Sequence, residues 1–323
     1  PVYVSQLSGD ARRAAATTLA ALAGPRTVFL ASSDFTHYGR GFSFQPFPAD
    51  DAAPVRLREL DESVIDAAGT LESAEFFKVL RATGATVCGY EPIGLLLETL
   101  RLVSEPEEIF QMTLDYQTSG EITGDFRQSV SYAALGYFPY RALELDAEDG
   151  RALAESARRT LAHYLATGER RPLPSEAAGR PALERRAPAF VTLHSAGELR
   201  GCVGRLEAGE PLARLVPRLA LSAALEDSRF TPLRPGEAAL DVELSVLSPL
   251  KRILSLDRFR VDEHGAALNA AGSRGLLLPQ VATERNWSAG QFFEALARKA
   301  GVGREVYADP SAQVHVFRAQ VIR

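Results

Sequence analysis

The sequence predicts two modules in series, an α/β module followed by an α+β module. The chain has 323 residues, which is more than one hydrophobic core usually organises. In the first part, apolar runs alternate with segments of helical periodicity, a pattern typical of strands and helices above a mostly parallel sheet. In the second part, a helical segment precedes two adjacent strand-like runs, and the later elements follow without regular alternation.

The first module is predicted from apolar runs, helical spacing and turn residues. Strands are expected at 1–4, 27–32, 110–116 and 129–138, the second of them (TVFLAS) buried. Helices are expected over 10–23, where Gly24 and Pro25 give a stop signal, and over about 60–68, 73–83 and 92–102. Residues 39–51 contain two prolines and several aromatic residues, so they are expected to form a long irregular loop.

The second module follows an acidic segment that loses the strand pattern. We expect the first module at 1–140, a linker at 141–149 and the second module at 150–323. The remaining elements are helices at 151–166, about 211–225 and about 288–300, and strands at 190–193, 199–206 and 240–247. Residues 195–198 (SAGE) are expected to join the first two of these strands as a hairpin.

Composition and charge are those of an ordinary globular chain. Hydrophobic residues make up 46% and charged residues 24% of the sequence. Residues 1–145 hold 11 Lys and Arg against 19 Asp and Glu, and residues 146–323 hold 25 against 22, so the first module is acidic and the second weakly basic. This balance argues against nucleic-acid binding by the first module and only weakly permits it in the second.

The cysteine count and the hydropathy pattern predict a cytoplasmic protein that does not enter a membrane. Only Cys88 and Cys202 are present, too few for a disulfide framework, and each is expected to be a free thiol. No apolar run approaches the length of about 18 residues that a membrane-spanning helix needs. The sequence opens at Pro1 rather than Met, so an upstream segment is left open.

The first candidate site lies in the segment SSDFTHYG, directly after the predicted strand 27–32. Ligands of open parallel sheets bind at the carboxyl ends of strands, which is where Asp34 and His37 are expected. The simpler alternative is that Asp34 caps the following turn and His37 packs locally.

The second candidate is Cys88, in the segment TVCGYEPIG ahead of a predicted helix. Pro92 suits the first turn of that helix. The positive end of a helix dipole favours the thiolate, which attacks electrophiles and binds soft metals. The alternative is that Cys88 is a small buried apolar residue.

Together, SSDFTHYG, TVCGYEPIGLLLETL and SVSYAALGYF resemble the Memo family in wording, order and spacing. The resemblance implies a sheet like that of extradiol dioxygenases, which use non-heme iron, and a pocket lined by three histidines and one cysteine. It places one of these histidines at His37 and the cysteine at Cys88, as ligands for iron or copper, with Asp34 as a neighbouring acid. His37 and Asp34 are then candidate catalytic residues.

The metal site that this resemblance implies is incomplete in the sequence. The other two histidines belong to the front half of the family, and no other histidine precedes His163. Three explanations are open: the chain is a fragment of a longer protein, a partner chain supplies the missing ligands, or the module has lost its chemistry. A sheet cut through its middle would expose an unpaired edge, which favours the fragment.

The third candidate is the segment GELRGCVG, a predicted strand interrupted by two glycines. Glycine in a strand marks a bulge or a close backbone approach, so Cys202 is expected where a ligand meets the main chain. Arg200 would activate its thiol. A tightly packed hairpin in which Cys202 fills the core is equally compatible with these residue types.

The segments FVTLHSAGELRGCVG, AALEDSRFTPL, ELSVLSPL and GLLLPQVATERNWSAGQFFEALARKAG resemble the AMMECR family. The resemblance implies an α+β fold whose proposed site surrounds the LRGC segment. It carries over Arg200, Gly201, Asp227 and Arg229 as substrate-binding residues and Cys202 as a catalytic residue. We expect His194 and Trp287 to be structural, with Trp287 largely in the core, and Glu284 and Arg285 to form a solvated turn.

The combination of these two families resembles the prokaryotic AmmeMemoRadiSam system, in which they recur with a radical-SAM protein. The resemblance implies a metal-dependent oxidative or modifying enzyme, with metal in the first module and substrate in the second. The substrate would be a small molecule, for which a modified nucleobase is one guess. The alternative from another class is a non-catalytic scaffold protein that binds a ligand or a peptide for a partner enzyme.

Overall fold

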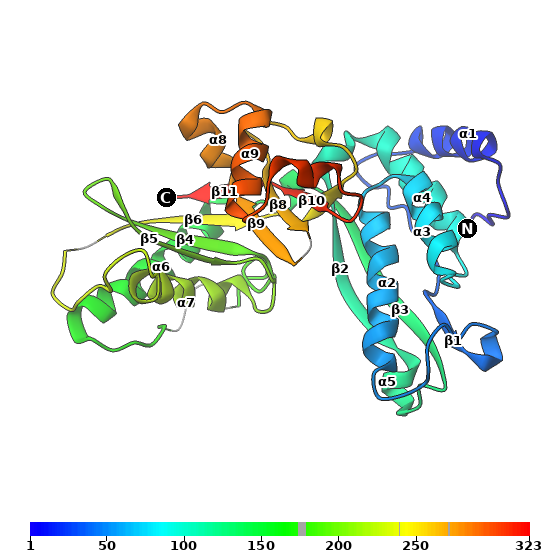
Figure 1. Ribbon diagram of the computed structural model, residues 1–323, viewed down its shortest axis with the longest axis horizontal. Coiled ribbons are helices and arrows are strands. Elements are labelled where there is room, and N and C mark those ends of the chain that lie inside the picture. The colour runs from blue at the N-terminus through cyan, green and yellow to red at the C-terminus, as the bar shows by residue number, and fades with distance from the viewer. Residues whose placement is uncertain (174–178, 239, 271) are drawn as a thin grey trace. The chain divides into compact units, whose positions relative to one another are not determined.

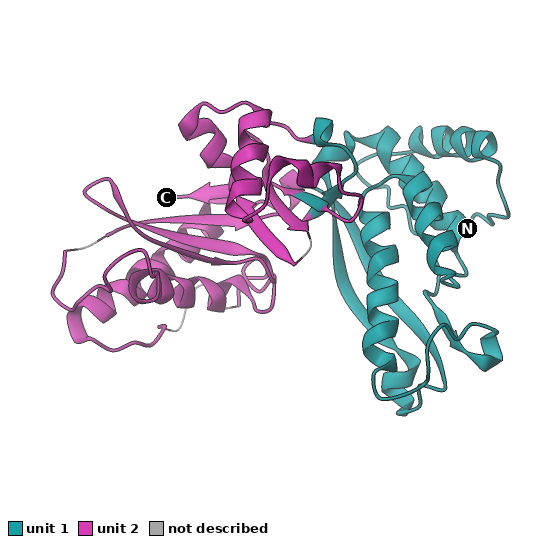
Figure 2. Ribbon diagram, in the orientation of Figure 1, with its two compact units in different colours: residues 1–139, 251–258, 313–315 teal, residues 140–250, 259–312, 316–323 magenta. Residues whose placement is uncertain are grey.

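The protein folds into two compact units (Figure 2), seen in a computed structural model that describes residues 1–173, 179–238, 240–270 and 272–323. Unit 1 comprises Pro1–Pro139, Lys251–Arg258 and Gln313–His315, and unit 2 comprises Tyr140–Leu250, Phe259–Ala312 and Val316–Arg323. Two short segments from late in the sequence therefore belong to the first unit.

Unit 1 contains most of the elements expected of the first module (Figure 1). Its α-helices are α1 (Gly9–Ala20), α2 (Ala53–Gly69), α3 (Ser73–Thr83), α4 (Tyr90–Val103) and α5 (Ser119–Thr123). Its strands and 3-10 turns are β1 (His37–Gly39), η1 (Arg40–Phe42), η2 (Pro106–Glu108), β2 (Ile109–Thr118), β3 (Gln128–Pro139), β7 (Lys251–Ile253) and η4 (Leu256–Arg258).

Local sequence explains where several of these helices begin and end. Pro54 occupies the first turn of α2, where its missing N–H costs nothing. Gly84 ends α3 in the left-handed conformation. Helix α5 is only five residues long, but the side chains of Thr118 and Glu121 form a capping box at its start.

The sheet of unit 1 is antiparallel, so the expectation of a mostly parallel sheet is wrong. Its order is β1-β3-β2, and β1 and β2 both pair with β3 in antiparallel register. In Figure 1, β2 and β3 form a long hairpin-like pair. The two strands are joined by the short α5 segment, a connection that suits antiparallel neighbours and is too short for a parallel crossover.

The strands predicted at 1–4 and 27–32 are also wrong. Neither segment belongs to a strand, and TVFLAS is not buried: Val28 is 88% exposed and Leu30 is 89% exposed. A strand is defined by hydrogen bonds to a neighbour, and among the described residues this segment has none of the ladder type. The apolar run alone therefore indicates neither pairing nor burial.

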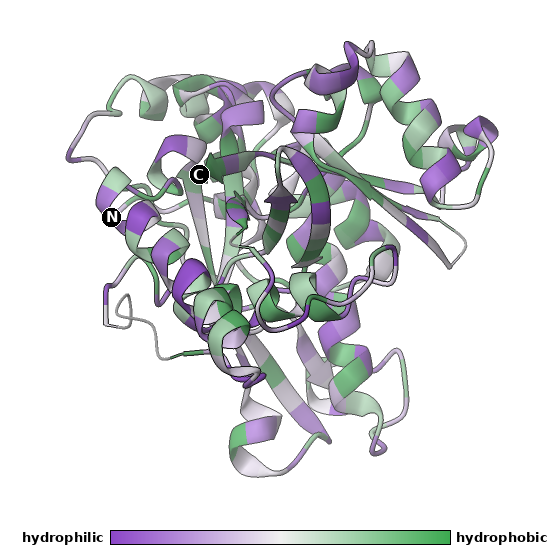
Figure 3. Cartoon of the chain, turned by 90° about the vertical axis from the view of Figure 1, so that its left-hand side faces the viewer, coloured by the Kyte–Doolittle hydropathy of each residue, from purple (hydrophilic) through white to green (hydrophobic). Residues whose placement is uncertain are grey.

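The core of unit 1 lies among α2, α3, α4 and the sheet. Its largest fully buried side chains include Phe76, Leu71 and Leu97, and Phe35 packs into the same cluster from the segment that precedes β1. Figure 3 shows hydrophobic and hydrophilic residues sharing the same helices, as expected of amphipathic helices that bury one face. Phe35 thus anchors the chain one residue after Asp34 and two residues before His37.

Lys251 is a buried cation within unit 1. The residue is 6% exposed, and its ammonium donates to the carbonyl oxygens of Pro106 and Ile109. Burial lowers the pKa of Lys251 to about 8. The neighbouring Arg252 pairs with Asp66 (2.7 Å) and Glu75 (3.1 Å), so β7 is held by both charge and backbone contacts.

We expect Lys251 to make the stability of the protein rise between pH 8 and pH 10. The folded chain releases this proton near pH 8 and the unfolded chain near its ordinary value of about 10.4, so the unfolded state binds more protons in between. The gain in the free energy of unfolding from pH 8 to pH 10 should be roughly 2 kcal/mol.

Urea unfolding of the wild type and of Lys251→Met at several pH values measures this gain. Lys251→Met should flatten the rise, and the exposed Lys78→Met should not; equal slopes in all three would refute the assignment.

Unit 2 contains the elements expected of the second module and several more. Its α-helices are α6 (Ala147–Thr167), α7 (Leu212–Leu225), α8 (Pro279–Arg285) and α9 (Ala289–Lys299). Its strands are β4 (Ala189–Ser195), β5 (Glu198–Arg205), β6 (Asp241–Leu247), β8 (Gly265–Ala270), β9 (Ser273–Leu277) and β11 (Ala319–Ile322), with β10 (Gln313–Phe317) ending in it. The 3-10 turns η3 (Tyr140–Ala142) and η5 (Arg304–Ala308) complete the list, so η3 and the start of α6 occupy much of the expected linker.

The main sheet of unit 2 has the order β11-β6-β4-β5 and is antiparallel throughout. Helices α6 and α7 pack against one face, where Val191, Leu193, Val242 and Leu244 are buried. Because side chains alternate along a strand, the other residues of β4 and β6 point away from α6 and α7.

A second sheet has the order β7-β10-β8-β9, and α8 and α9 pack near its β8-β9 hairpin.

Two remaining expectations concern Trp287 and membrane helices. Trp287 is half-buried rather than largely in the core, because it lies under the guanidinium of Arg285, whose carbon is 5.2 Å from the ring centroid. Glu284 and Arg285 are exposed as expected, although they end α8 rather than forming a turn. Within the described ranges, no helix combines the length and the apolar character needed to cross a membrane.

Candidate functional site

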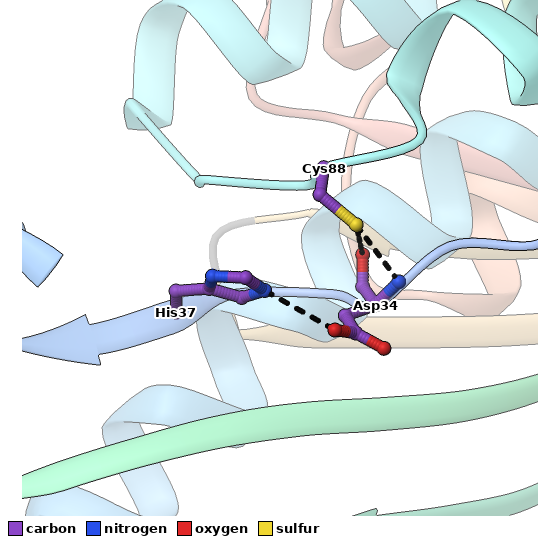
Figure 4. Close-up of side chains that lie close together, drawn as sticks. All are labelled: Asp34, His37 and Cys88. Carbon is purple, nitrogen blue, oxygen red and sulfur yellow. Dashed lines mark hydrogen bonds and ion pairs between the residues drawn. The ribbon is translucent and has the colours of Figure 1, made fainter.

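Asp34, His37 and Cys88 come together in unit 1 (Figure 4). One ligand atom from each residue lies within 4.8 Å of the other two. His37 Nε2 is 3.4 Å from Asp34 Oδ2, and the thiol of Cys88 approaches from the segment that leads into α4. The structure thus unites the two sequence segments that were proposed separately as sites.

Three side-chain hydrogen bonds connect these segments to each other. Thr86 Oγ1 accepts a hydrogen bond from the backbone N–H of His37 (2.8 Å) and donates to the His37 carbonyl (3.0 Å). Ser33 Oγ accepts from the N–H of Gly89 (2.8 Å) and also donates within its own segment, to the carbonyl of Asp34 (2.7 Å). The two segments that carry the potential ligands are therefore held together beside those ligands.

A buried carboxylate supports the same segment from below. Asp61 on α2 has no exposed surface, and its Oδ1 accepts from the N–H (3.3 Å) and the hydroxyl (2.6 Å) of Thr36. Its Oδ2 accepts from the hydroxyl of Tyr116 (2.7 Å). Burial, reinforced by the Asp61 charge, raises the pKa of Tyr116 far above its usual value, so this hydroxyl remains a donor. The sequence reasoning missed Asp61, since one acid on a helix carries no local signal of burial.

The cluster offers one nitrogen, one sulfur and one oxygen donor to a ligand. His37 Nε2 has no solvent contact and no hydrogen-bond partner among the described residues, although the imidazole as a whole is partly exposed. The backbone N–H of Asp34 donates to Cys88 Sγ (3.2 Å). Cys88 is exposed, so its expected alternative as a buried apolar residue is wrong.

Unit 2 contains a pocket of about 650 Å³ on the face of the main sheet that α6 and α7 leave free. Cys202 and Arg229 line it. The other lining residues come from β4 to β6, α6, α8 and the chain end: Arg158, Thr192, His194, Gly197, Leu199, Asp241, Val242, Glu243, Leu278, Gln280, Val281, Glu284 and Arg323.

Asp227 organises the Cys202 end of this pocket. Its carboxylate accepts from the backbone N–H of Cys202 (2.8 Å) and pairs with the guanidinium of Arg229 (2.7 Å), which also donates to the Cys202 carbonyl (3.3 Å). The Arg229 hydrogen bonds hold the pKa of Asp227 well below its usual range, with the Cys202 N–H adding to the effect. The thiol itself accepts from the hydroxyl of Thr192 (3.4 Å) and is partly exposed, so Cys202 is not simply core filler.

Arg200 and Gly201 do not line the pocket. The sheet register skips Arg200, which makes it the bulged residue expected from the glycine pattern, and its guanidinium lies 3.7 Å from Glu237. Gly201 faces α7, where an added Cβ would meet the carbonyl oxygen of Ala223 at 2.1 Å. The close backbone approach predicted at this glycine therefore exists, but its partner is a helix.

Several lining residues were missed by the sequence reasoning. Thr192 and His194 alternate on β4, and Asp241 and Glu243 alternate on β6, so all four share one face. This alternation was visible in the sequence, but a polar strand face ordinarily indicates solvent. His194 was expected to be structural; it is half-buried and lines the pocket.

Comparisons with known proteins agree with this architecture. The family model described as AMMECR1 matches residues 154–322, and the model described as Memo-like protein matches residues 1–136. A protein of Methanothermobacter thermautotrophicus is 37% identical over 55% of this chain and 95% of its own length. A protein of Methanopyrus kandleri is 34% identical over 55% of this chain and 89% of its own length.

A solved structure supports the same assignment for the second part of the chain. The crystal structure of an uncharacterized protein from Pyrococcus horikoshii covers 55% of this chain and 92% of its own, with 31% identity and a TM-score of 0.51. The AMMECR1 model spans more than half of the 323 residues. The chain therefore belongs to the AMMECR1 family and carries a Memo-like domain ahead of its AMMECR1 domain.

Proposed function

We propose that this protein is a metal-dependent oxidative or modifying enzyme whose Memo-like unit holds the metal. The observation that carries the proposal is the cluster of Asp34, His37 and Cys88, whose ligand atoms lie within 4.8 Å of one another. A three-ligand set of protein side chains is typical of catalytic metal sites, which keep a position open for substrate or water. A thiolate and an imidazole suit iron or copper better than magnesium or calcium.

The residues present fit such an ion on their own chemistry. Among the described residues, the buried Nε2 of His37 makes no hydrogen bond and lies 3.4 Å from the Asp34 carboxylate, so ligation would satisfy it. The N–H of Asp34 orients the Cys88 sulfur, and Thr86 and Ser33 hold the two ligand-bearing segments together. When bound, an iron or copper ion would supply redox chemistry that these side chains lack.

In this proposal the AMMECR1 unit binds the substrate in its 650 Å³ pocket, with Cys202 as a catalytic residue and Arg229 as a contact. Asp227 is a positioning residue, because it acts through Arg229 and the Cys202 backbone. The family resemblance further suggests a radical-SAM protein as the partner and a small molecule, such as a nucleobase, as the substrate.

Elemental analysis of the purified protein tests the metal site. We expect close to one iron or copper ion per chain, lost in His37→Ala and in Cys88→Ser. His163→Ala and Cys202→Ser are matched controls, since both residues belong to unit 2 and neither is a member of the cluster, and both should keep the ion. Thermal unfolding should show that all four variants remain folded. A metal-free wild type, or metal content that these variants do not change, would contradict the proposal.

A second candidate function is a non-catalytic scaffold that binds a ligand. It is favoured by the contacts of the cluster itself, because His37 faces the Asp34 carboxylate and Cys88 Sγ accepts a backbone N–H. The same elemental analysis separates the two candidates. A protein that binds small molecules in unit 2 and holds no metal in unit 1 would be such a scaffold.

A further inference from the structure

We propose that the pocket of unit 2 binds a small organic cation, such as a primary amine or an amidine with an apolar body. The inference takes from the proposed function only the assignment of substrate binding to unit 2, and it does not depend on a metal in unit 1. The residues that line the pocket, and the partners that some of them already have, indicate this class of ligand.

Carboxylates dominate one end of the pocket. Asp241 and Glu243 lie on the free face of β6, directly across the sheet from His194 and Thr192. Glu284 faces the same space from α8. Among the residues that the structure describes, the side chains of Asp241 and Glu284 make no hydrogen bond or ion pair, although the Glu284 charge acts on Arg323, so Asp241 above all is available to a ligand.

Each arginine that lines the pocket already has an acidic side chain of the protein close to its guanidinium. Arg229 pairs with Asp227, which lies behind the pocket wall, and its pKa is raised by those hydrogen bonds. Arg323 pairs with Glu243 at 2.7 Å. The guanidinium of Arg158 lies 3.9 Å from Glu155. At the end of the pocket formed by β6 and α8, the charge left without a close partner is therefore negative, which favours a cation there over a phosphate or carboxylate ligand.

Gln280 supplies an independent sign of a missing hydrogen-bond donor. Its Nε2 donates to the buried hydroxyl of Ser245 (3.0 Å), while its Oε1 has no solvent contact and no partner within the described parts of the chain. A buried oxygen without a donor loses the hydrogen bonds that it makes to water in the unfolded chain, so a ligand N–H would stabilise it. Gln280 lies one helical turn before Glu284 on α8, so both side chains face the pocket from one side.

The size and the apolar walls indicate what the cation is attached to. A volume of about 650 Å³ is within the usual range of small-molecule sites. Leu199, Leu278 and Val281 provide apolar surface. Cys202, Thr192 and Glu243 form one row across three neighbouring strands, which places the thiol roughly 10 Å from the carboxylates. An amine bound at the acidic end would direct its apolar body toward Cys202.

Calorimetric titration of the full chain, freed of metal by a chelator, tests the ligand class. The probes are phenethylamine, its neutral counterpart 2-phenylethanol and the anion phenylacetate. We expect phenethylamine to bind at least tenfold more tightly than either of the others. The double variant Asp241→Asn and Glu284→Gln should lower its affinity at least tenfold and leave 2-phenylethanol unchanged. Both residues are exposed, so the variant should fold.

The matched control is Glu198→Gln, since Glu198 is an exposed acid on β5 that does not line the pocket. It should bind phenethylamine as the wild type does. If Glu198→Gln lowered the affinity for phenethylamine as much as the double variant, the effect would come from the general negative charge of the surface, and the proposal would be overturned. Tighter binding of phenylacetate, or equal binding of all three probes, would also overturn it.

Alkylation by iodoacetamide gives a second readout. Phenethylamine should slow modification of Cys202 and leave that of Cys88 unchanged; protection of both thiols or of neither would contradict the pocket assignment. These measurements need no metal, so failure here and failure of the metal centre are separate results.

Discussion

Asp61→Ala should lower the free energy of unfolding by about 3–5 kcal/mol. The substitution leaves the N–H and hydroxyl of Thr36 and the hydroxyl of Tyr116 without their acceptor in a region closed to water. It also opens a cavity where a fully buried side chain stood. Urea unfolding at neutral pH measures the loss.

The design includes a milder variant and a surface control. Asp61→Asn keeps an oxygen for Thr36 and should lose less than half as much stability. Glu59→Ala removes an exposed acid from the same helix and should change the free energy of unfolding by less than about 0.5 kcal/mol. If Asp61→Ala matched Glu59→Ala, Asp61 would not be a support of the 34–37 segment.

Gly201→Ala should destabilise the protein by about 3 kcal/mol or more. The new methyl group would sit 2.1 Å from the Ala223 carbonyl oxygen, and that oxygen belongs to the backbone of α7, so no flexible side chain can move aside. Strand β5 and α7 must therefore separate, and the end of the pocket that holds Cys202 should be distorted. Thermal unfolding and iodoacetamide modification of Cys202 measure these two effects.

Gly209→Ala is the matched control for this change. Nothing lies within 4 Å of a Cβ at Gly209, and its backbone is not in the left-handed region, so the variant should unfold like the wild type. If the Gly201→Ala protein had normal stability but lost ligand binding, Gly201 would instead be a substrate-binding residue, as the family resemblance implies.

The helices were the part of the fold that could be predicted well. Helical spacing of apolar residues, together with signals such as Gly24-Pro25 and Pro92, predicted α1, α3, α4 and α6 close to their observed bounds. These signals act within one or two turns of the chain, so they are complete in the sequence. The long strands β2 and β3 were also located correctly.

Strand partners and burial could not be predicted in the same way. The segment TVFLAS has the composition of a buried strand, yet Val28 and Leu30 are exposed. Pairing depends on residues far along the chain, and an apolar run does not specify whether a neighbour is parallel, antiparallel or absent. The same limit applies to β7, which the sequence places in the second module and the contacts place in unit 1.

The candidate residues were predicted more fully than their surroundings. Asp34, His37 and Cys88 were named from local segments, and the structure brings them together. Cys202 and Arg229 line a pocket, while Gly201 has a packing role and Arg200 lies outside. Asp61, Gln280 and Asp241 were not foreseen, because burial and unsatisfied hydrogen bonds arise only from tertiary contacts.

The bonds of Ser33 and Thr86 have a consequence for the order in which this protein would mature. They connect residues that are 56 and 49 positions apart in the chain. A newly made polypeptide that has not yet closed these loops presents its imidazole and its thiol singly, and single side chains hold transition metals weakly. An ion would therefore be acquired by the finished fold rather than help to build it, and chelators should strip the ion without unfolding the chain.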